Sequence, residues 1–384
     1  MQLLSSIGAY GYSAAWQIVP PLFVLTIVVF FHELGHFLVA RWCGVAVKVF
    51  SIGFGKEILG YTDRKGTRWR LSMIPLGGFV RFLGDENEAG MPDRRALDNL
   101  KPEERELAFA GKRVGQRAAI VAAGPIANFI LAIVIFSAIF AFYGREVTSA
   151  RVDSVVANTP AERAGFKPGD LVVAINGRHI DNFNELQRIV SISTGQTLAI
   201  DVMRDGHVVS LTATPARQTV ADGFGNKRTG LGIQRNTKSG EITVEHFTPV
   251  QAVGMAVSES WFIAESTLSY LVGVVAGRES ADQLGGPIRV AEVSAQVATL
   301  GLVPLINLAA FLSISIGLIN LFPVPILDGG HLLFFTFEAV RGRPLSDRVQ
   351  EIGFRIGFVA IVALMLFVTG NDLHFWQWLA HVES

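Results

Sequence analysis

The sequence predicts an α-helical polytopic membrane protein of about four transmembrane helices. A membrane-associated β-hairpin follows the first helix, and an α+β module is inserted between helices 2 and 3. Three observations support this fold class. Half of the 384 residues are hydrophobic and 17% are charged, against about 25% in a typical soluble protein. The charges are segregated, so that four long stretches contain none, and the segments between them carry strand and turn signals.

The four uncharged stretches cover residues 1–31, 118–144, 293–327 and 356–371. Each supplies most or all of the roughly 20 apolar residues that a membrane-spanning helix needs. We therefore expect spans near residues 18–40, 118–142, 301–322 and 353–370. Arg355 lies near one end of the last span, where its long side chain can reach the membrane surface.

The remaining segments complete the predicted organisation. In order, we expect a first transmembrane helix in 1–40, a cytoplasmic β-loop region in 41–117, a second helix in 118–142, a soluble module in 147–240, a membrane-surface region in 248–300, a third helix in 301–330, a cytoplasmic loop in 331–352 and a fourth helix in 353–370. Glu259 and Glu265 interrupt the apolar stretches of 248–277. This pattern favours an amphipathic helix on the membrane surface, with a fifth span as the alternative.

The distribution of basic residues predicts the orientation. Residues 41–117 contain fifteen Lys or Arg and ten acidic residues, whereas residues 145–292 contain fourteen basic and sixteen acidic residues. Because cytoplasmic segments carry the excess of Lys and Arg, we expect 41–117 in the cytoplasm and 145–292 outside. Arg341, Arg343 and Arg348 also fall on the cytoplasmic side in this arrangement.

Residues 67–83 alternate between polar and apolar side chains, a period of two that is typical of strands. Gly77-Gly78 provides a turn signal, so we predict a β-hairpin here, and residues 45–58 read as a further strand. Leu71 and Met73 lie on its apolar face. Such strands beside the helices would offer an open edge to an extended peptide. The alternative is a hairpin packed on itself.

His32, Glu33 and His36 lie within the first predicted span, in the stretch VVFFHELGHFLVA. Ionisable residues are costly at membrane depth, and those found there usually mark a functional site. Histidines four apart share one face of a helix, which suits two ligands of a tetrahedral zinc. Glu33 follows the first histidine, as the general base does in the His-Glu-x-x-His pattern of metalloproteases.

Zinc held by two histidines needs a third protein ligand, and Asp328 is the strongest candidate. It is the only acid of the long apolar region that ends the third span, in NLFPVPILDGGH. Pro323 and Pro325 would break the helix, and the glycines that follow Asp328 let the backbone approach closely. His331 is a rival ligand. A helix cap at the membrane surface is the alternative role for Asp328.

The second span carries AAGPIANFILA, in which Gly124 and Ala127 permit tight contact between helices. Asn128 is polar at membrane depth. It can support the site by hydrogen bonding towards it, or it can serve helix packing alone.

Residues 151–214 read as strand, short helix, glycine turn, strand and helix, followed by a hairpin that turns at Asp205-Gly206. The segment AERAGFKPGDLVVAINGRHI, residues 161–180, resembles a PDZ domain of the bacterial periplasmic type. By this resemblance, the loop TGLGI at 229–233 would bind a peptide C-terminus through its backbone N–H groups.

Together, HELGH, GPIANF, NLFPVPILDGG and the intervening module resemble the site-2 protease family of intramembrane zinc metalloproteases. FSIGFG, PLGGFVRFLGD and GGPIRVAE extend the match to the bacterial regulator-of-sigma-E protease (RseP) type. The resemblance implies zinc (Zn²⁺) bound by His32, His36 and Asp328, with Glu33 activating water. It also implies substrate contacts, for which we expect Asn320, Pro323, Pro325, Leu71, Met73, Gly77 and Gly78.

The resemblance further implies regulated intramembrane proteolysis in the bacterial inner membrane, with the PDZ domain on the periplasmic side. Expected partners are single-pass membrane proteins such as anti-sigma factors of the sigma-E stress response, remnant signal peptides, peptide C-termini at the PDZ domain and the lipid bilayer. No nucleic acid is expected. The best-known members have two PDZ domains in tandem, whereas this chain shows one.

Two other classes of function remain open on the sequence. A metal or proton transporter could use His32, Glu33, His36 and Asp328 as a conduction path, although transporters commonly carry internal repeats and none is visible. A non-catalytic scaffold could use the PDZ module alone, but it would have no need of a glutamate beside two histidines.

Overall fold

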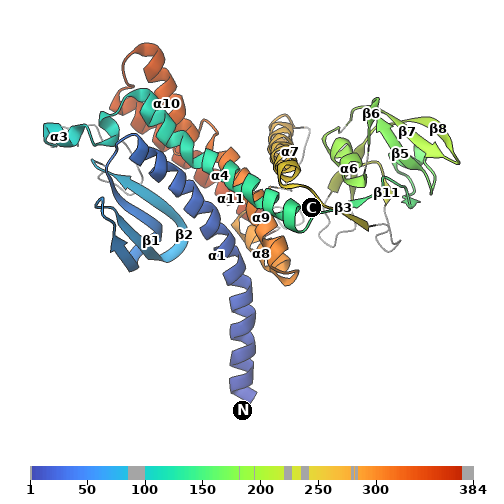
Figure 1. The fold of residues 1–384 in the computed structure, drawn as a ribbon, viewed down its shortest axis with the longest axis horizontal. Helices are drawn as coiled ribbons and strands as arrows, with labels where there is room; N and C mark the ends of the chain where they lie inside the picture. Colours follow the sequence, from blue (N-terminus) through green and yellow to red (C-terminus); the bar gives the residue numbers. More distant parts are fainter. Residues whose placement is uncertain are drawn as a thin grey trace, which may run out of the picture. The chain divides into compact units, whose positions relative to one another are not determined.

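The computed structural model describes residues 2–84, 100–180, 182–193, 195–219, 227–234, 242–277, 281 and 284–373. The chain forms two compact units. The first comprises residues 1–139, 253–267 and 280–384, and the second comprises residues 140–252 and 268–279. Figure 1 shows long helices and a curved sheet in the first unit and short strands and helices in the second.

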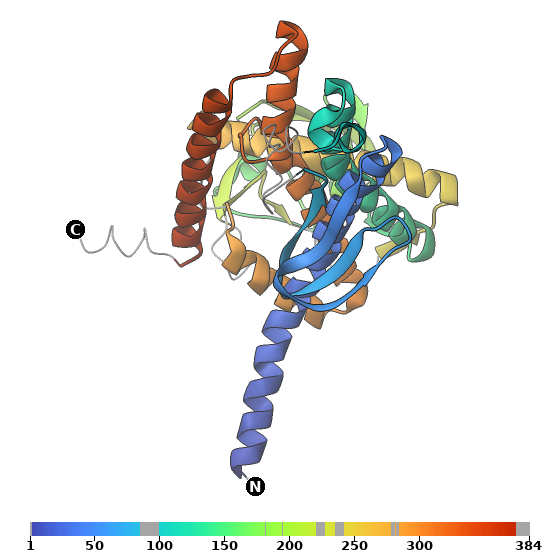
Figure 2. The same cartoon turned by 90° about the vertical axis from the view of Figure 1, so that its left-hand side faces the viewer.

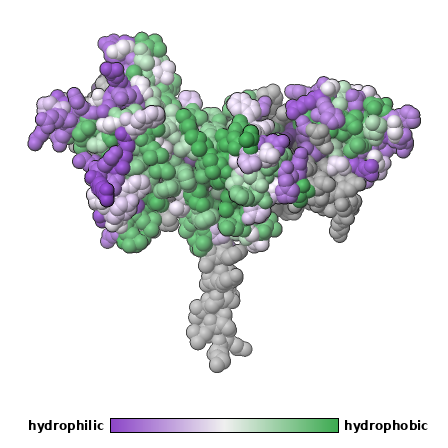
Figure 3. All heavy atoms as spheres, viewed as in Figure 1, coloured by the Kyte–Doolittle hydropathy of each residue, from purple (hydrophilic) through white to green (hydrophobic). Residues whose placement is uncertain are grey.

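Four helices of the described chain are long and apolar enough to cross a membrane, as predicted. They lie in α1 (Gln2–Trp42), α4 (Val114–Phe142), α9 (Leu302–Asn320) and α11 (Asp347–Asp372). Their most apolar windows differ in burial, from 50% in α4 to 11% in α11. Helix α4 is therefore central to the helical unit, and α11 presents most of its apolar surface outwards, as a lipid-facing helix does. Figure 3 shows hydrophobic residues over these helices and hydrophilic residues around α3 (Pro102–Arg105).

The third span ends where the prolines predict. Helix α9 stops at Asn320, three residues before Pro323, and residues 321–327 form turns. A new helix, α10 (Asp328–Arg341), then begins at Asp328. The predicted third helix through 330 and the predicted loop from 331 are thus wrong in detail, because α9 ends at Asn320 and a separate helix begins at Asp328.

An ion pair fastens α10 to α4. Arg117 of α4 is 5% exposed and donates a 2.7 Å hydrogen bond to Glu338 of α10. Its guanidinium also lies over the ring of Phe335, 5.0 Å from the centroid. Since a buried charge is stable only when it is paired, this contact fixes the helix that carries Asp328.

Strands β1 (Val47–Thr62) and β2 (Arg68–Phe82) form the predicted β structure beside α1 (Figure 2). Both strands bend, so residues 49–52 of β1 pair with residues 68–71 and also with residues 78–81 of β2. Residues 59–62 pair with 68–71 on the other side. The sheet therefore has two inner segments, and the edge segments are 59–62 and 78–82.

The sequence predicts the hairpin turn at Gly77-Gly78, but the turn lies at residues 63–67. There the carboxylate of Asp63 accepts hydrogen bonds from the backbone N–H groups of Lys65 and Thr67. Gly77 lies inside β2 with a φ of +108°, where a Cβ would be 2.6 Å from the ring of Phe54. Gly77 therefore marks a bend in the strand and a close approach to the ring of Phe54. Sequence alone does not distinguish these roles of a glycine from a turn.

Asp63 also joins the sheet to the end of α1. Its carboxylate accepts hydrogen bonds from Arg41 of α1 and, at 3.1 Å, from the indole N–H of Trp69. Burial by itself would raise the pKa of this carboxyl, but these donors and the turn N–H groups hold the pKa well below its usual range. The sheet is thus held against the helix that carries the histidines.

The predicted surface region 248–300 contains two helices, α7 (Pro249–Val275) and α8 (Pro287–Thr299). Helix α7 is not among the four described helices that are long and apolar enough to cross a membrane. The carboxylate of Asp372 in α11 accepts hydrogen bonds from the N–H groups of Gly286 and Arg289, at 2.9 and 3.1 Å. It thereby caps α8, whose own N-cap residue has no side chain.

The second unit is built on a four-stranded sheet in the order β6-β5-β7-β8. The strands of this unit are β3 (Arg145–Thr148), β4 (Ser154–Val155), β5 (Leu171–Ile175), β6 (Arg178–His179), β7 (Leu198–Arg204), β8 (His207–Ala213), β9 (Ala216–Thr219), β10 (Lys227–Gly230), β11 (Ile233–Gln234) and β12 (Ile242–Glu245). Helices α5 (Pro160–Arg163) and α6 (Phe183–Ile192) complete it. The β7–β8 hairpin turns at Asp205-Gly206, as predicted, and both residues have a positive φ.

Candidate metal centre

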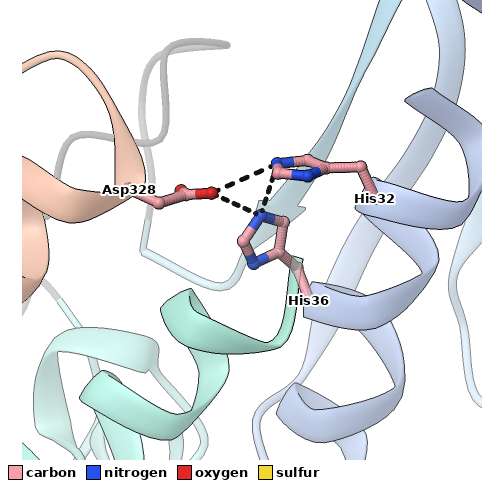
Figure 4. Close-up of side chains that lie close together, drawn as sticks. All are labelled: His32, His36 and Asp328. Carbon is pink, nitrogen blue, oxygen red and sulfur yellow. Dashed lines mark hydrogen bonds and ion pairs between the residues drawn. The ribbon is translucent and has the colours of Figure 1, made fainter. Parts of the chain in front are cut away.

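Two histidines one turn apart on α1 present their rings to the same point. The centroids of the His32 and His36 rings are 4.8 Å apart, and the rings are inclined by 85°. Their Nε2 atoms are 3.2 Å apart. Figure 4 shows both rings directed at the carboxylate of Asp328.

Asp328 completes this cluster from α10. Its Oδ2 lies 3.2 Å from Nε2 of His32 and 3.5 Å from Nε2 of His36. The three candidate ligand atoms all lie within 4.8 Å of one another. The three side chains keep 12–18% exposure, so the site is enclosed but reachable.

These three groups fit a zinc ion. Two imidazole nitrogens and one carboxylate oxygen form a known donor set for catalytic zinc, which leaves a fourth position open. Oδ2 of Asp328 is buried, and among the described residues its close polar neighbours are the two Nε2 atoms. A buried carboxylate is costly unless it is paired with positive charge, and a cation among the three atoms would supply that charge.

The turn before α10 places Asp328. A Cβ at Gly329 would be 2.3 Å from the carbonyl oxygens of Leu321 and Phe322, and one at Gly330 would be 2.2 Å from that of Val324. Both glycines are therefore required for the close approach that the sequence predicts. Asp328 is the first residue of α10, but the N-cap residue is Leu327 and no side chain caps this helix start, so the alternative role of Asp328 as a helix cap is wrong.

Helix α4 packs closely against α1 at the two histidines, and small residues on both helices allow this contact. A Cβ at Gly124 would be 2.3 Å from Nε2 of His36, and one at Gly35 would be 2.2 Å from the carbonyl oxygen of Ala123. The predicted tight helix contact at Gly124 and Ala127 is thus confirmed.

The Nδ1 atoms of both histidines contact α4. Nδ1 of His36 lies 2.9 Å from the carbonyl oxygen of Ile120, a distance that suits donation from Nδ1–H. Nδ1 of His32 lies 3.3 Å from Nδ2 of Asn128, which is fully buried. Asn128 therefore lies against the site as well as in a helix interface.

Glu33 lies beside the cluster, between α1 and the edge of the sheet. It interacts electrostatically with His32, His36 and Asp328, and it accepts a hydrogen bond from the backbone N–H of Val80. A Cβ at Gly78 would be 3.3 Å from Cγ of Glu33. Gly78 thus allows the edge segment 78–82 to reach the glutamate.

The remaining predicted site residues are distributed around this centre. Asn320 ends α9, and the exposed Pro323 and the half-buried Pro325 follow in the turn before Asp328. Leu71 and Met73 have side chains that are 38% and 61% exposed.

The rival ligand is not part of the cluster. The ring of His331 packs against the rings of Phe335 and Phe354, with ring centroids 6.5 and 5.3 Å apart. The prediction of an open strand edge at Leu71 is also wrong, because Leu71 pairs with Ile52 on one side and with Leu59 on the other.

Sequence reasoning missed three parts of the site: the carbonyl oxygen of Ile120, the close packing of Gly35 and the N–H of Val80. Two of them are backbone groups, which carry no side-chain signal. Gly35 is the small residue inside HELGH, and its role depends on a helix that is distant in sequence.

Comparison with known proteins decides the family. The model for "Peptidase family M50" matches residues 21–364, which is most of the chain. The chain belongs to peptidase family M50. The predicted resemblance to the site-2 protease family is therefore confirmed, and the protein is a zinc metallopeptidase of the membrane.

Relatives extend this result over nearly the whole length. A zinc metalloprotease of Agrobacterium fabrum is 49% identical over 358 residues, 93% of this chain and 95% of the relative. One of Rhizobium meliloti is 47% identical over 355 residues, 92% of this chain and 95% of the relative. The metalloprotease MmpA of Caulobacter vibrioides is 41% identical over 384 residues, 93% of this chain and 95% of the relative.

Proposed function

We propose that the protein cuts peptide bonds within the membrane, with His32, His36 and Asp328 as zinc ligands and Glu33 as general base. The observation that carries this proposal is the convergence of three ligand atoms within 4.8 Å, two of them from a helix able to span a membrane. An additional acid beside such a cluster distinguishes a hydrolytic site from a structural one.

Each residue has a defined task. Bound zinc supplies a Lewis acid that polarises a carbonyl and acidifies water. Glu33 takes a proton from the attacking water and gives it to the leaving amine. The N–H of Val80 holds the Glu33 carboxylate in place, and the carbonyl oxygen of Ile120 orients the ring of His36.

The substrate would bind as an extended strand. A transmembrane helix shields its carbonyl groups by hydrogen bonding, so the segment that is cut must unwind. The edge segment 78–82 lies beside Glu33 and has no second strand partner among the described residues. We place the substrate strand along this edge, with Gly77, Gly78 and Met73 of the sheet and Asn320, Pro323 and Pro325 of the α9–α10 turn as contacts.

The proposed membrane, orientation and substrates rest on the sequence and on the family resemblance. The family resemblance favours the bacterial inner membrane, and the charge distribution favours residues 145–292 on its periplasmic side. The second unit would act as a single PDZ domain that binds peptide C-termini at residues 229–233, where Leu231 is buried and Gly232 has a φ of +89°. Substrates would be single-pass membrane proteins, including anti-sigma factors and remnant signal peptides, as in the sigma-E response.

A direct test uses the purified protein in detergent with a single-pass membrane protein as substrate. We expect cleavage inside the apolar segment, loss of cleavage on chelation and recovery with zinc. Uptake of metal or protons into vesicles that contain the purified protein distinguishes a transporter from a protease. Uptake of metal or protons that requires His32 and Asp328, without any cleavage, would contradict the proposal.

A further inference from the structure

We propose that Asn128 positions His32 for zinc by accepting a hydrogen bond from its Nδ1–H through the amide oxygen. This inference rests on the ligand set proposed above. It concerns a single contact between α4 and α1, and it assigns to Asn128 a positioning role that helix packing alone would not require.

The amide of Asn128 has one atom engaged and one atom unsatisfied. The side chain is fully buried, and its Nδ2 lies 3.3 Å from Nδ1 of His32. Its Oδ1 is buried and has no hydrogen-bond partner in the described structure. An amide oxygen left unsatisfied in the interior costs about 1–3 kcal/mol.

Zinc binding decides which atom of the amide faces His32. Nε2 of His32 points at Asp328 and His36, so it must offer its lone pair to the metal. A neutral imidazole then carries its proton on Nδ1. With Nδ2 towards His32, two donors would face each other. Turning the amide by 180° places Oδ1 at Nδ1, so that Nδ1–H gains an acceptor and Oδ1 a donor, and it moves Nδ2 to the position that has no described partner.

The surroundings hold Asn128 at this position. Ser313 of α9 is fully buried, and its hydroxyl donates to the backbone carbonyl of Asn128 at 2.9 Å. A Cβ at Gly317 would be 3.1 Å from Cβ of Asn128. The backbone of Asn128 is thus clamped between helices, and its amide has little freedom other than this rotation.

The two histidines then follow one pattern. Nδ1–H of His36 donates to the backbone carbonyl of Ile120, and Nδ1–H of His32 donates to the side chain of Asn128. Partners of this kind fix the tautomer and ring orientation of metal ligands, and their loss typically lowers metal affinity 10- to 100-fold. Only the partner of His32 can be removed by substitution.

The test compares zinc affinities of the full-length protein, measured by competition with a chelator. Asn128→Leu keeps the size of the side chain but removes the acceptor, and we expect a 10- to 100-fold loss of affinity. Asn128→Asp keeps an acceptor and removes the donor, and we expect affinity within a few-fold of the parent. The matched control is Ser137→Ala in the same helix, whose hydroxyl bonds only to Ile133, and no change is expected.

Opposite results would overturn the inference. Parental affinity in Asn128→Leu would show that the contact does not support the ligand. A large loss in Asn128→Asp as well as in Asn128→Leu would show that the amide donates. If Asn128→Asp does not fold, ¹⁵N NMR of histidine-labelled, zinc-loaded parent protein replaces it. We expect a protonated Nδ1 on His32, and an unprotonated Nδ1 would contradict the assignment.

The readout separates this inference from the proposed function. If His32→Ala retained full zinc affinity, the ligand set itself would be wrong. If His32→Ala lost zinc but Asn128→Leu did not, only the positioning role would fail. The absence of proteolysis with any substrate would leave the affinity differences interpretable.

Discussion

The carbonyl oxygen of Ile120 and the absence of a side chain at Gly124 shape the candidate metal centre together with its proposed ligands. His32, Glu33 and His36 are predictable from sequence, because their spacing on a helix is itself the signal. The choice between Asp328 and His331 is not, because it depends on which side chain faces α1. The structure turns His331 towards Phe354 and Asp328 towards the histidines.

The ligand assignment makes a first prediction. His32→Ala, His36→Ala and Asp328→Asn each remove one of three donors, so each should reduce bound zinc to a small fraction and abolish cleavage. Metal content by mass spectrometry and cleavage of a model substrate measure the two effects. His331→Ala is the control and should retain zinc. Full zinc content in Asp328→Asn would refute the assignment of the third ligand.

A second prediction concerns Gly124. Its substitution by alanine would place a Cβ 2.3 Å from Nε2 of His36 and 2.9 Å from Cε1 of His32. The rings would have to move, so we expect at least a tenfold loss of zinc affinity. Gly115→Ala, at the start of the same helix, introduces a Cβ into open space. Equal affinities of the two variants would show that the close packing is not required.

At the scale of elements, whether a glycine bends a strand or ends it is the feature least predictable from sequence. The period of two correctly predicts strands in 67–83, but Gly53 and Gly77 bend β1 and β2 with positive φ rather than ending them. Because of these bends, residues 49–52 pair with two segments of β2, and Leu71 lies in an inner segment of the sheet. Local sequence identifies residues that can adopt such angles, whereas the neighbouring chain decides how they are used.

The edge at 78–82 leads to a prediction for substrates. A strand added to an edge uses its N–H groups alternately, because every second residue points its N–H at the sheet. N-methylation of successive residues in a substrate should therefore block cleavage at every second position near the cut bond. Cleavage rates of a series of synthetic substrates measure this. Uniform sensitivity along the series would argue against strand addition.

The second unit carries a pH-dependent ion pair. Asp170 is fully buried and accepts hydrogen bonds of 2.7 Å from Arg204. Burial by itself would raise the pKa of Asp170, but the hydrogen bonds from Arg204 and from the N–H of Lys167 keep it below its usual value. A carboxyl with a lowered pKa stabilises the fold above its unfolded pKa, about 3.9, and this contribution is lost as pH falls.

We therefore expect the stability of residues 151–213 to decline as pH falls below about 4. Asp170→Asn should lower it by about 2 kcal/mol at neutral pH, because Arg204 loses its charged hydrogen-bond acceptor. Hydrogen-exchange protection factors of the full-length protein, corrected for intrinsic rates, measure both effects. Unchanged protection in Asp170→Asn at pH 7 would contradict a stabilising role.

At the scale of the whole molecule, the sequence predicts the number of spans because lipid imposes a simple rule. A helix must supply about 20 apolar residues, and the 19 residues of α9 extend about 28 Å at 1.5 Å per residue. The burial of α4 and the exposure of α11 could not be predicted, because the most apolar stretches of the two helices are almost equally hydropathic. Which apolar face meets protein depends on packing between helices.

The most direct test of the central claim is the Glu33→Gln variant of the full-length protein. Glutamine preserves the size of the side chain and the contact near Val80, but it cannot take a proton from water. We expect zinc bound at the parental level and cleavage of a membrane-spanning substrate reduced at least a hundredfold. Cleavage by Glu33→Gln at the parental rate would contradict the account.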